Sequence, residues 1–163
     1  MMKTIARTLP LLLVVVVALV FTTVGMHTLP SADAQSVTTS IFASKKATGF
    51  KVVKPDRTVY GVQGAICVTN DGKAPTENLR IVDQVQYAPQ GGEFRDIPGA
   101  TFTIVPAAQL QPGESKCYQY DVRFTPPQDA FKFENTARVT ITNFTGFLGQ
   151  EFGPLLRVAF VLP

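Results

Sequence analysis

From residue 35 onward, hydrophobic and polar residues alternate with a period of two, and turn residues interrupt the alternation at short intervals. A period of two places successive side chains on opposite faces, which is typical of a half-buried β-strand. The 12 prolines and 12 glycines of the chain disfavour long helices, and no stretch of this region shows a helical face. The pattern predicts seven strands, at Val37–Ser44, Val59–Asn70, Leu79–Tyr87, Thr101–Val105, Lys116–Thr125, Thr136–Asn143 and Leu155–Leu162.

The alternation also assigns the two faces of each predicted strand. In Thr136–Asn143 the apolar residues Ala137, Val139 and Ile141 share one face, and threonines dominate the other. In Leu79–Tyr87 the apolar face is interrupted by Asp83. Seven short strands with turn residues between them predict an all-β fold, an antiparallel β-sandwich of about seven strands.

The two cysteines of the chain, Cys67 and Cys117, both fall on the outer faces of their predicted strands. Neighbouring strands hold opposed side chains about 4.5–5.5 Å apart, a spacing that suits a disulfide. We therefore predict a Cys67–Cys117 disulfide across two neighbouring strands of one sheet, as expected of paired cysteines in an exported protein. A reactive or metal-binding thiol pair is the alternative, but no histidine lies nearby in the sequence.

The N-terminal segment has the organisation of a secretory signal peptide. Lys3 and Arg7 precede an apolar run from Leu11 to Phe21, and Ala32-Asp33-Ala34 fits a small-x-small cleavage site. That run is shorter than the ~20 residues of a membrane-spanning helix, although an uncleaved anchor stays open as the alternative. We expect a signal helix in residues 1–34, a sandwich domain in residues 35–163, transient membrane contact only, and a secreted or cell-envelope location.

Charge and residue chemistry give little sign of a catalytic or nucleic-acid-binding protein. Without the leader, 13 basic and 11 acidic residues leave a net charge of 13 − 11 = +2, and only Lys45-Lys46 are adjacent, a pattern that we interpret as a solvated surface. The one histidine, His27, lies in the leader, so the predicted mature chain lacks the commonest general base and metal ligand. We expect no enzymatic activity, no catalytic or metal-binding residues, no cofactor and no nucleic-acid partner.

An acidic trio and a glycosylation pattern provide weaker signals. Asp71, Glu77 and Asp83 flank one chain reversal and could gather around Ca²⁺, but turn chemistry at Asp71 and a strand-end hydrogen bond at Asp83 also account for them. Residues 143–145, Asn-Phe-Thr, match an N-glycan acceptor pattern.

The loop before the last predicted strand is rich in glycine and phenylalanine. Most of the 12 phenylalanines should serve as core in a chain that lacks tryptophan. Three of them in this loop form a candidate exposed aromatic patch: Phe144, Phe147 and Phe152.

Three sequence motifs follow one another along the chain. The first is V-T-N-x-G-x-A-x-T, which begins at Val68 and is followed by Asp83. The second, L-x-P-G-E-S, begins at Leu110, and the third, N-T-A-x-V, begins at Asn135. Together they resemble the bacterial conserved-repeat Ig-like domain, with CARDB-type adhesion domains as relatives in pattern. The resemblance covers about residues 59–143 and implies an Ig-like antiparallel β-sandwich without catalytic residues that serves as a spacer, stalk or adhesive unit.

Two functions follow as hypotheses. The first is a non-enzymatic secreted or cell-surface Ig-like module for adhesion, binding or spacing, whose partner would be a protein or cell-envelope surface component. The second is a self-assembling structural subunit, pilin- or matrix-like, that donates an edge strand to its neighbour. Val37–Ser44 and Leu155–Leu162 are the terminal strands that could be donated.

Overall fold

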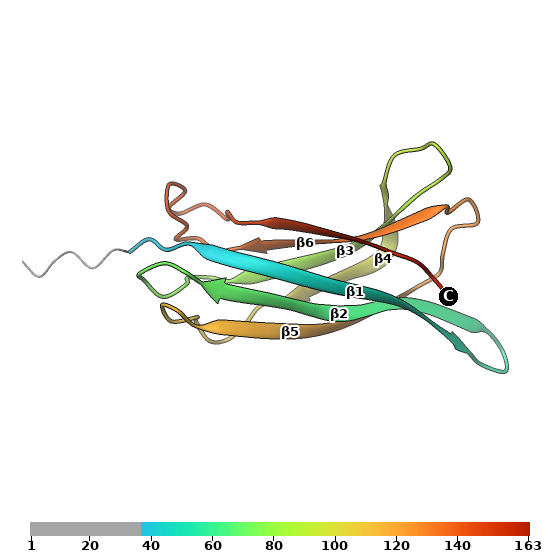
Figure 1. Cartoon of the computed structure of the whole chain (residues 1–163), viewed down its shortest axis with the longest axis horizontal. Helices are drawn as coiled ribbons and strands as arrows, with labels where there is room; N and C mark the ends of the chain where they lie inside the picture. Colours follow the sequence, from blue (N-terminus) through green and yellow to red (C-terminus); the bar gives the residue numbers. More distant parts are fainter. Residues whose placement is uncertain (1–36) are drawn as a thin grey trace, which may run out of the picture. The chain divides into compact units, whose positions relative to one another are not determined.

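The computed structural model describes residues 37–163, and the predicted signal peptide in residues 1–34 lies outside the described residues. The described residues form seven strands that run back and forth along one direction (Figure 1). No helix in this part of the chain is long and apolar enough to cross a membrane. The strands are β1 (Ile41–Val53), β2 (Thr58–Asn70), β3 (Arg80–Ala88), β4 (Arg95–Ile104), β5 (Ser115–Phe124), β6 (Lys132–Thr140) and β7 (Leu155–Phe160).

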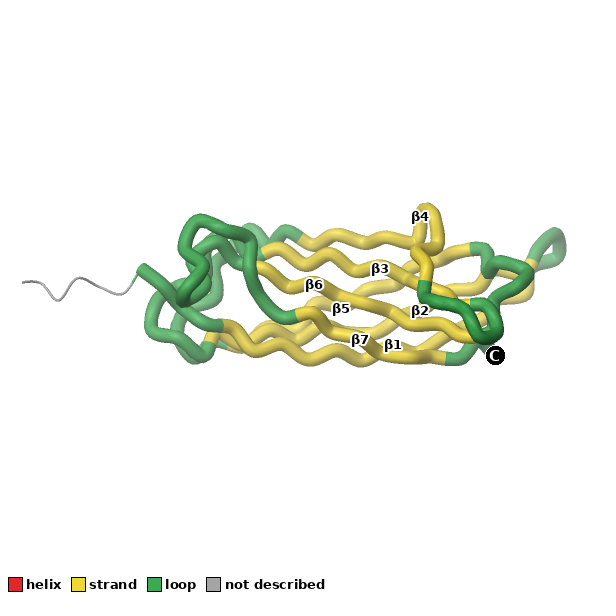
Figure 2. The backbone as a smooth tube through the Cα atoms, turned by 90° about the horizontal axis from the view of Figure 1, so that it is seen from above, coloured by secondary structure: helices red, strands yellow, loops and turns green. Residues whose placement is uncertain are grey.

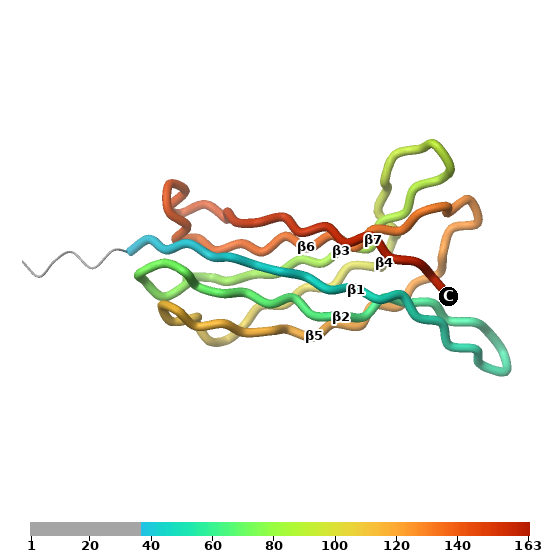
Figure 3. The backbone as a smooth tube through the Cα atoms, viewed as in Figure 1, coloured from blue at the N-terminus to red at the C-terminus, as the bar shows by residue number. Residues whose placement is uncertain are grey.

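The strands form two antiparallel sheets that pack face to face. One sheet has the order β1-β2-β5 and the other has the order β4-β3-β6-β7 (Figure 3). The chain crosses from one sheet to the other after β2, after β4 and after β5. The predicted all-β sandwich of seven strands is confirmed, and its connections are those of immunoglobulin-like folds.

The apolar faces predicted from the alternation form the core between the sheets. Val62, Ile66 and Val68 of β2 are fully buried, and so are Ile81 and Val85 of β3. Each such side chain stabilises the fold by roughly 1.5–3 kcal/mol relative to an exposed position. More exposed and more buried positions alternate along most of β2 and β5, as the parity predicts.

The first strand differs most from its prediction. The predicted strand ended at Ser44, whereas β1 begins at Ile41 and continues to Val53, paired with β2 over its full length. A tight turn closes this hairpin, in which the Lys54 amide donates to the Arg57 carbonyl at 2.8 Å. The sequence pattern does not predict this continuation, because the residues directly after Ser44 are polar. The strand continues past Ser44 because its backbone pairs with β2.

Asn70 organises the connection between β2 and β3, and its side chain is fully buried. Its Oδ1 accepts from Thr39 Oγ1 at 2.6 Å and from the Gly72 amide at 3.1 Å. Its Nδ2 donates to the carbonyls of Ala74 and Leu110 at 2.8 and 2.9 Å. One side chain therefore joins the turn to the segment before β1 and to the loop before β5.

The loop before β5 is held by the second motif of the resemblance. The Leu110 amide donates to Thr76 Oγ1 at 2.9 Å, and the Thr76 amide donates to the Leu110 carbonyl at 3.0 Å. Gly113 has a positive φ of 78°, a conformation that glycine adopts readily, and its amide donates to the Asn70 carbonyl at 2.8 Å. The first two motifs therefore form one clasp between two loops.

Candidate functional site

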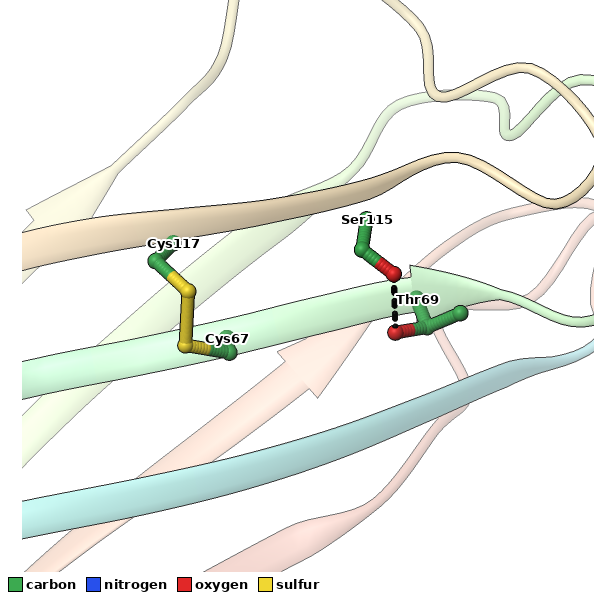
Figure 4. Close-up of a disulfide and its surroundings, with 4 residues drawn as sticks. All are labelled: Cys67, Thr69, Ser115 and Cys117. Carbon is green, nitrogen blue, oxygen red and sulfur yellow. Dashed lines mark hydrogen bonds between the residues drawn. A yellow bond between two sulfur atoms is a disulfide. The ribbon is translucent and has the colours of Figure 1, made fainter.

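The two cysteines lie directly opposite each other on β2 and β5 and form a disulfide. The bond spans neighbouring strands of one sheet and stands on its outer face, as predicted (Figure 4). Thr69 and Ser115 form a second polar cross-strand pair on the same face, two positions away from the disulfide. Their hydroxyl oxygens lie 2.7 Å apart. The predicted Cys67–Cys117 pairing is thus confirmed.

The three phenylalanines of the candidate patch lie together. Phe147 and Phe152 stack with ring centroids 3.6 Å apart and an interplanar angle of 4°, and Phe144 lies 5.0 Å from Phe152. Phe147 and Phe152 are 38% and 37% exposed, whereas Phe144 packs against the core. We call these residues the phenylalanine trio. Its use in binding stays a prediction.

The acidic trio does not form a cation site. Asp71 and Glu77 are exposed, whereas Asp83 is fully buried in the core, and the described residues contain no cluster of metal-ligating side chains. The strand-end interpretation of Asp83 is also wrong, because this residue lies in the middle of β3 and faces the other sheet.

Asn143 of the glycosylation pattern is buried, with 1% of its surface exposed. Its Nδ2 donates to the carbonyls of Val37 and Pro75 at 3.0 and 2.8 Å. Its Oδ1 accepts from the Glu77 amide at 2.9 Å. In the folded protein this amide nitrogen is engaged inside the structure, so the pattern does not mark an accessible acceptor.

A polar cluster lies between the two sheets and joins them. Lys45 extends inward from β1, and its Nζ contacts Asp83 Oδ2 of β3; the two side chains are 1% and 0% exposed. Asn135 of β6 is also fully buried, and its Nδ2 donates to Asp83 Oδ1 at 2.5 Å and to the Gln84 carbonyl at 3.2 Å. We call Lys45, Asp83 and Asn135 the buried triad.

Burial shifts the ionisation of both charged members toward neutral forms. Desolvation lowers the pKa of Lys45 from its ordinary value, and the attraction of Asp83 opposes this shift without reversing it. Desolvation likewise raises the pKa of Asp83, opposed by Lys45 and by the hydrogen bonds from Lys45 and Asn135. Relative to the same two groups on a protein surface, this site shifts Lys45 toward the neutral amine and Asp83 toward the neutral carboxylic acid.

Tyr120 of β5 covers the lysine from its own sheet. Lys45 Nζ lies 4.2 Å from the centroid of the Tyr120 ring, and the Tyr120 hydroxyl donates to the Lys46 carbonyl at 2.8 Å. Burial, followed by the nearby Asp83 carboxylate, raises the pKa of Tyr120. Gly64 permits this close packing, because a Cβ there would lie 1.9 Å from the Lys46 carbonyl oxygen.

The sequence reasoning did not identify the buried triad. Lys45 was interpreted as part of a solvated surface, which is wrong, because its side chain is buried by a partner 38 residues away. A signal was present for Asp83, which interrupts the apolar face of its strand. Asn135 and Asp83 also belong to the motifs of the resemblance, and those two motif positions meet in the core.

Comparisons with known proteins give low similarities. No protein-family model matches the chain, and no curated protein sequence matches it. The sporulation control protein Spo0M of Bacillus subtilis is similar at 15% identity, with a TM-score of 0.43, over 76% of this chain and 49% of that one. The chain thus spans about half the length of Spo0M.

Two further structures are similar to this chain. The DNA glycosylase AlkC of Pseudomonas fluorescens is 9% identical, with a TM-score of 0.41, over 75% of this chain and 30% of that one. The CARDB domain of the PF1109 protein of Pyrococcus furiosus is 15% identical, with a TM-score of 0.37, over 76% of this chain and 87% of that one. All three TM-scores lie below 0.5.

Proposed function

We propose that the protein is a non-enzymatic Ig-like module outside the cytosol that acts as a spacing and binding unit of the cell surface. The observation that carries the proposal is the direction of the chain through the sandwich. Residue 37 and residue 163 lie at opposite ends of the strands (Figures 1 and 3). A module built in this way separates whatever is attached at its two ends by the length of its strands.

The covalent and polar ties of the sandwich support the same proposal. The Cys67–Cys117 disulfide is stable in oxidising compartments, outside the cytosol. The motif resemblance to conserved-repeat Ig-like domains supports a place among surface modules of that kind. Cell fractionation tests the location: the protein should be recovered from the envelope or the medium, and recovery from the cytosol alone would refute the proposal.

The binding part of the proposal rests on the phenylalanine trio, which lies in the loop between β6 and β7. Stacked, partly exposed aromatic side chains are typical of the residues that dominate protein interfaces. Replacing Phe147 and Phe152 by alanine should lower retention of the purified protein on cell-envelope fractions about tenfold or more. Phe42→Ala is the matched control, because this residue is 63% exposed on β1. Equal retention of both variants would exclude the trio as the binding surface.

The strand-donating alternative has less support. β1 pairs along its whole length with β2, and β7 pairs with β6 in the second sheet. The two strands lie side by side where the sheets meet (Figure 2). Both donatable strands thus complete their own domain. Size-exclusion chromatography with light scattering should give a monomer, whereas concentration-dependent polymers would favour the alternative.

A further inference from the structure

The buried triad brings an amine, a carboxyl group and a carboxamide together between the two sheets. Each group comes from a different strand, Lys45 from β1, Asp83 from β3 and Asn135 from β6. Asp83 lies between the other two, with Oδ2 against the lysine nitrogen and Oδ1 against the asparagine nitrogen. The three side chains are shielded from bulk solvent, because each is at most 1% exposed.

As a resting ion pair, the triad is poorly explained. Burying two charges costs free energy that their attraction often fails to offset, so a buried ion pair adds little net stability. Asn135 Oδ1 is in addition a buried oxygen without a hydrogen-bond partner, one of two such side-chain atoms among the described residues. An unsatisfied buried carbonyl costs roughly 1–3 kcal/mol and calls for a physical explanation.

We propose that Lys45 and Asn135 react with each other after folding, so that an amide bond from Lys45 Nζ to Asn135 Cγ crosslinks the two sheets. The contacts of Asp83 with both nitrogens and the shielding of the site from bulk solvent carry this inference. Asp83 is the proton carrier of the reaction. The inference concerns the core of the domain and does not depend on the proposed function.

The reaction balances without any further reagent. Lys45 passes one ammonium proton to Asp83 Oδ2 and becomes a neutral amine, and its nitrogen lone pair attacks Asn135 Cγ. The Cγ–Nδ2 bond breaks as Asp83 delivers a proton to Nδ2, so ammonia leaves. Nζ then gives up a second proton to the Asp83 carboxylate. The products are a secondary amide and a neutral carboxylic acid on Asp83.

The protonation states that the core favours agree with this sequence of steps. A lowered lysine pKa supplies a nucleophile and a raised aspartate pKa supplies an acid, and both shifts arise first from burial. Each Asp83 oxygen already contacts one of the two nitrogens whose proton number changes. A group held within hydrogen-bond reach of both reactants satisfies the geometric requirement for proton transfer.

The crosslink would tie the first strand to the opposite sheet. The chain enters the domain through β1 and leaves after β7, which pairs with β6. The disulfide joins β2 to β5 and includes no residue of β1, which pairs with β2 through backbone hydrogen bonds. A bond from β1 to β6 connects the first strand covalently to the opposite sheet.

Peptide mapping of the protein as isolated tests the inference. The purified protein is denatured, reduced and digested with trypsin, and the peptides are analysed by tandem mass spectrometry. We expect residues 133–138 to be attached through Asn135 to the peptide that contains Lys45, with the mass of one ammonia lost. Intact mass alone does not decide, because cyclisation of an N-terminal Gln35 also releases ammonia.

Variants separate the chemistry from the fold. Lys45→Arg keeps the charge but cannot form the bond, so residues 133–138 should be released completely as a free peptide. The matched control Lys46→Arg, on the exposed face of the same strand, should keep the branched peptide. Asp83→Asn should also release the free peptide, and far-UV circular dichroism shows whether both variants retain the fold.

Two results would overturn the inference. Complete recovery of unmodified Lys45 and Asn135 peptides from the wild-type protein would show that no bond forms. A branch from Lys45 to residues 81–95 with the mass of one water lost would show that Asp83, and not Asn135, is the acceptor. A faster-migrating denatured band for the wild type than for Lys45→Arg is expected as an independent readout.

Discussion

Replacing Cys67 and Cys117 by serine removes a covalent tie without creating a cavity in the core, because both sulfurs stand on the outer face of the sheet. The sequence separation of 50 residues sets the magnitude. In the chain-entropy model, opening a loop of this length lowers the free energy of unfolding by about 4 kcal/mol. A loss of this size is a large share of the ~5–15 kcal/mol that stabilises a typical domain.

Urea unfolding followed by far-UV circular dichroism and tyrosine fluorescence measures this loss. With a slope of ~2 kcal/mol per molar urea, the midpoint should fall by about 2 M. The control is the double variant Thr69→Ala/Ser115→Ala, which removes the neighbouring cross-strand pair and should cost under about 1 kcal/mol. A loss below about 1 kcal/mol for the cysteine variant would refute the reasoning, because the unfolded loop would then be restrained without the disulfide.

Three further predictions concern the core and the clasp. Lys45→Met leaves the Asp83 carboxyl group buried without a neighbouring cation. Burial raises the pKa of Asp83, so the folded state keeps a proton on this group that the unfolded state loses above about pH 4. The free energy of unfolding of this variant should therefore fall as pH rises from 4 to 7, measured by urea unfolding at each pH, and a flat profile would contradict the assigned burial. Asn70→Ala leaves several buried groups of the clasp unpaired and should cost about 3 kcal/mol, read from the urea midpoint, whereas a loss under 1 kcal/mol would show that the clasp contributes little. Gly64→Ala forces a Cβ against the Lys46 carbonyl and should lower the free energy of unfolding by about 1–3 kcal/mol, seen as a lower melting temperature. An unchanged melting temperature would show that the carbonyl does not lie against this position.

The period of two was sufficient to predict the number of strands and most of their inward faces. Strand parity also placed Cys67 and Cys117 on one outer surface, because side-chain direction in a strand depends only on position along the chain. Such local properties can be read from sequence without knowledge of the partner strand. The ends of the strands were less well predicted, since β1 owes its second half to pairing with β2.

The buried triad could not be predicted from local pattern. A lysine beside a second lysine is ordinarily solvated. The approach of Asp83 from the opposite sheet offsets part of the free-energy cost of burying Lys45. The interruption of the β3 core face by Asp83 was the one visible signal. Interpreting it required knowing that Asn135 lies beside it on β6, which the pairing of β3 with β6 determines.

The central proposal is that this chain is exported and acts outside the cytosol as a disulfide-tied sandwich module. Cell fractionation followed by mass spectrometry of the recovered protein tests it most directly. The account predicts a protein in the envelope or the medium that begins at Gln35 and contains the Cys67–Cys117 bond. Recovery from the cytosol with residues 1–34 attached and two free thiols would contradict it.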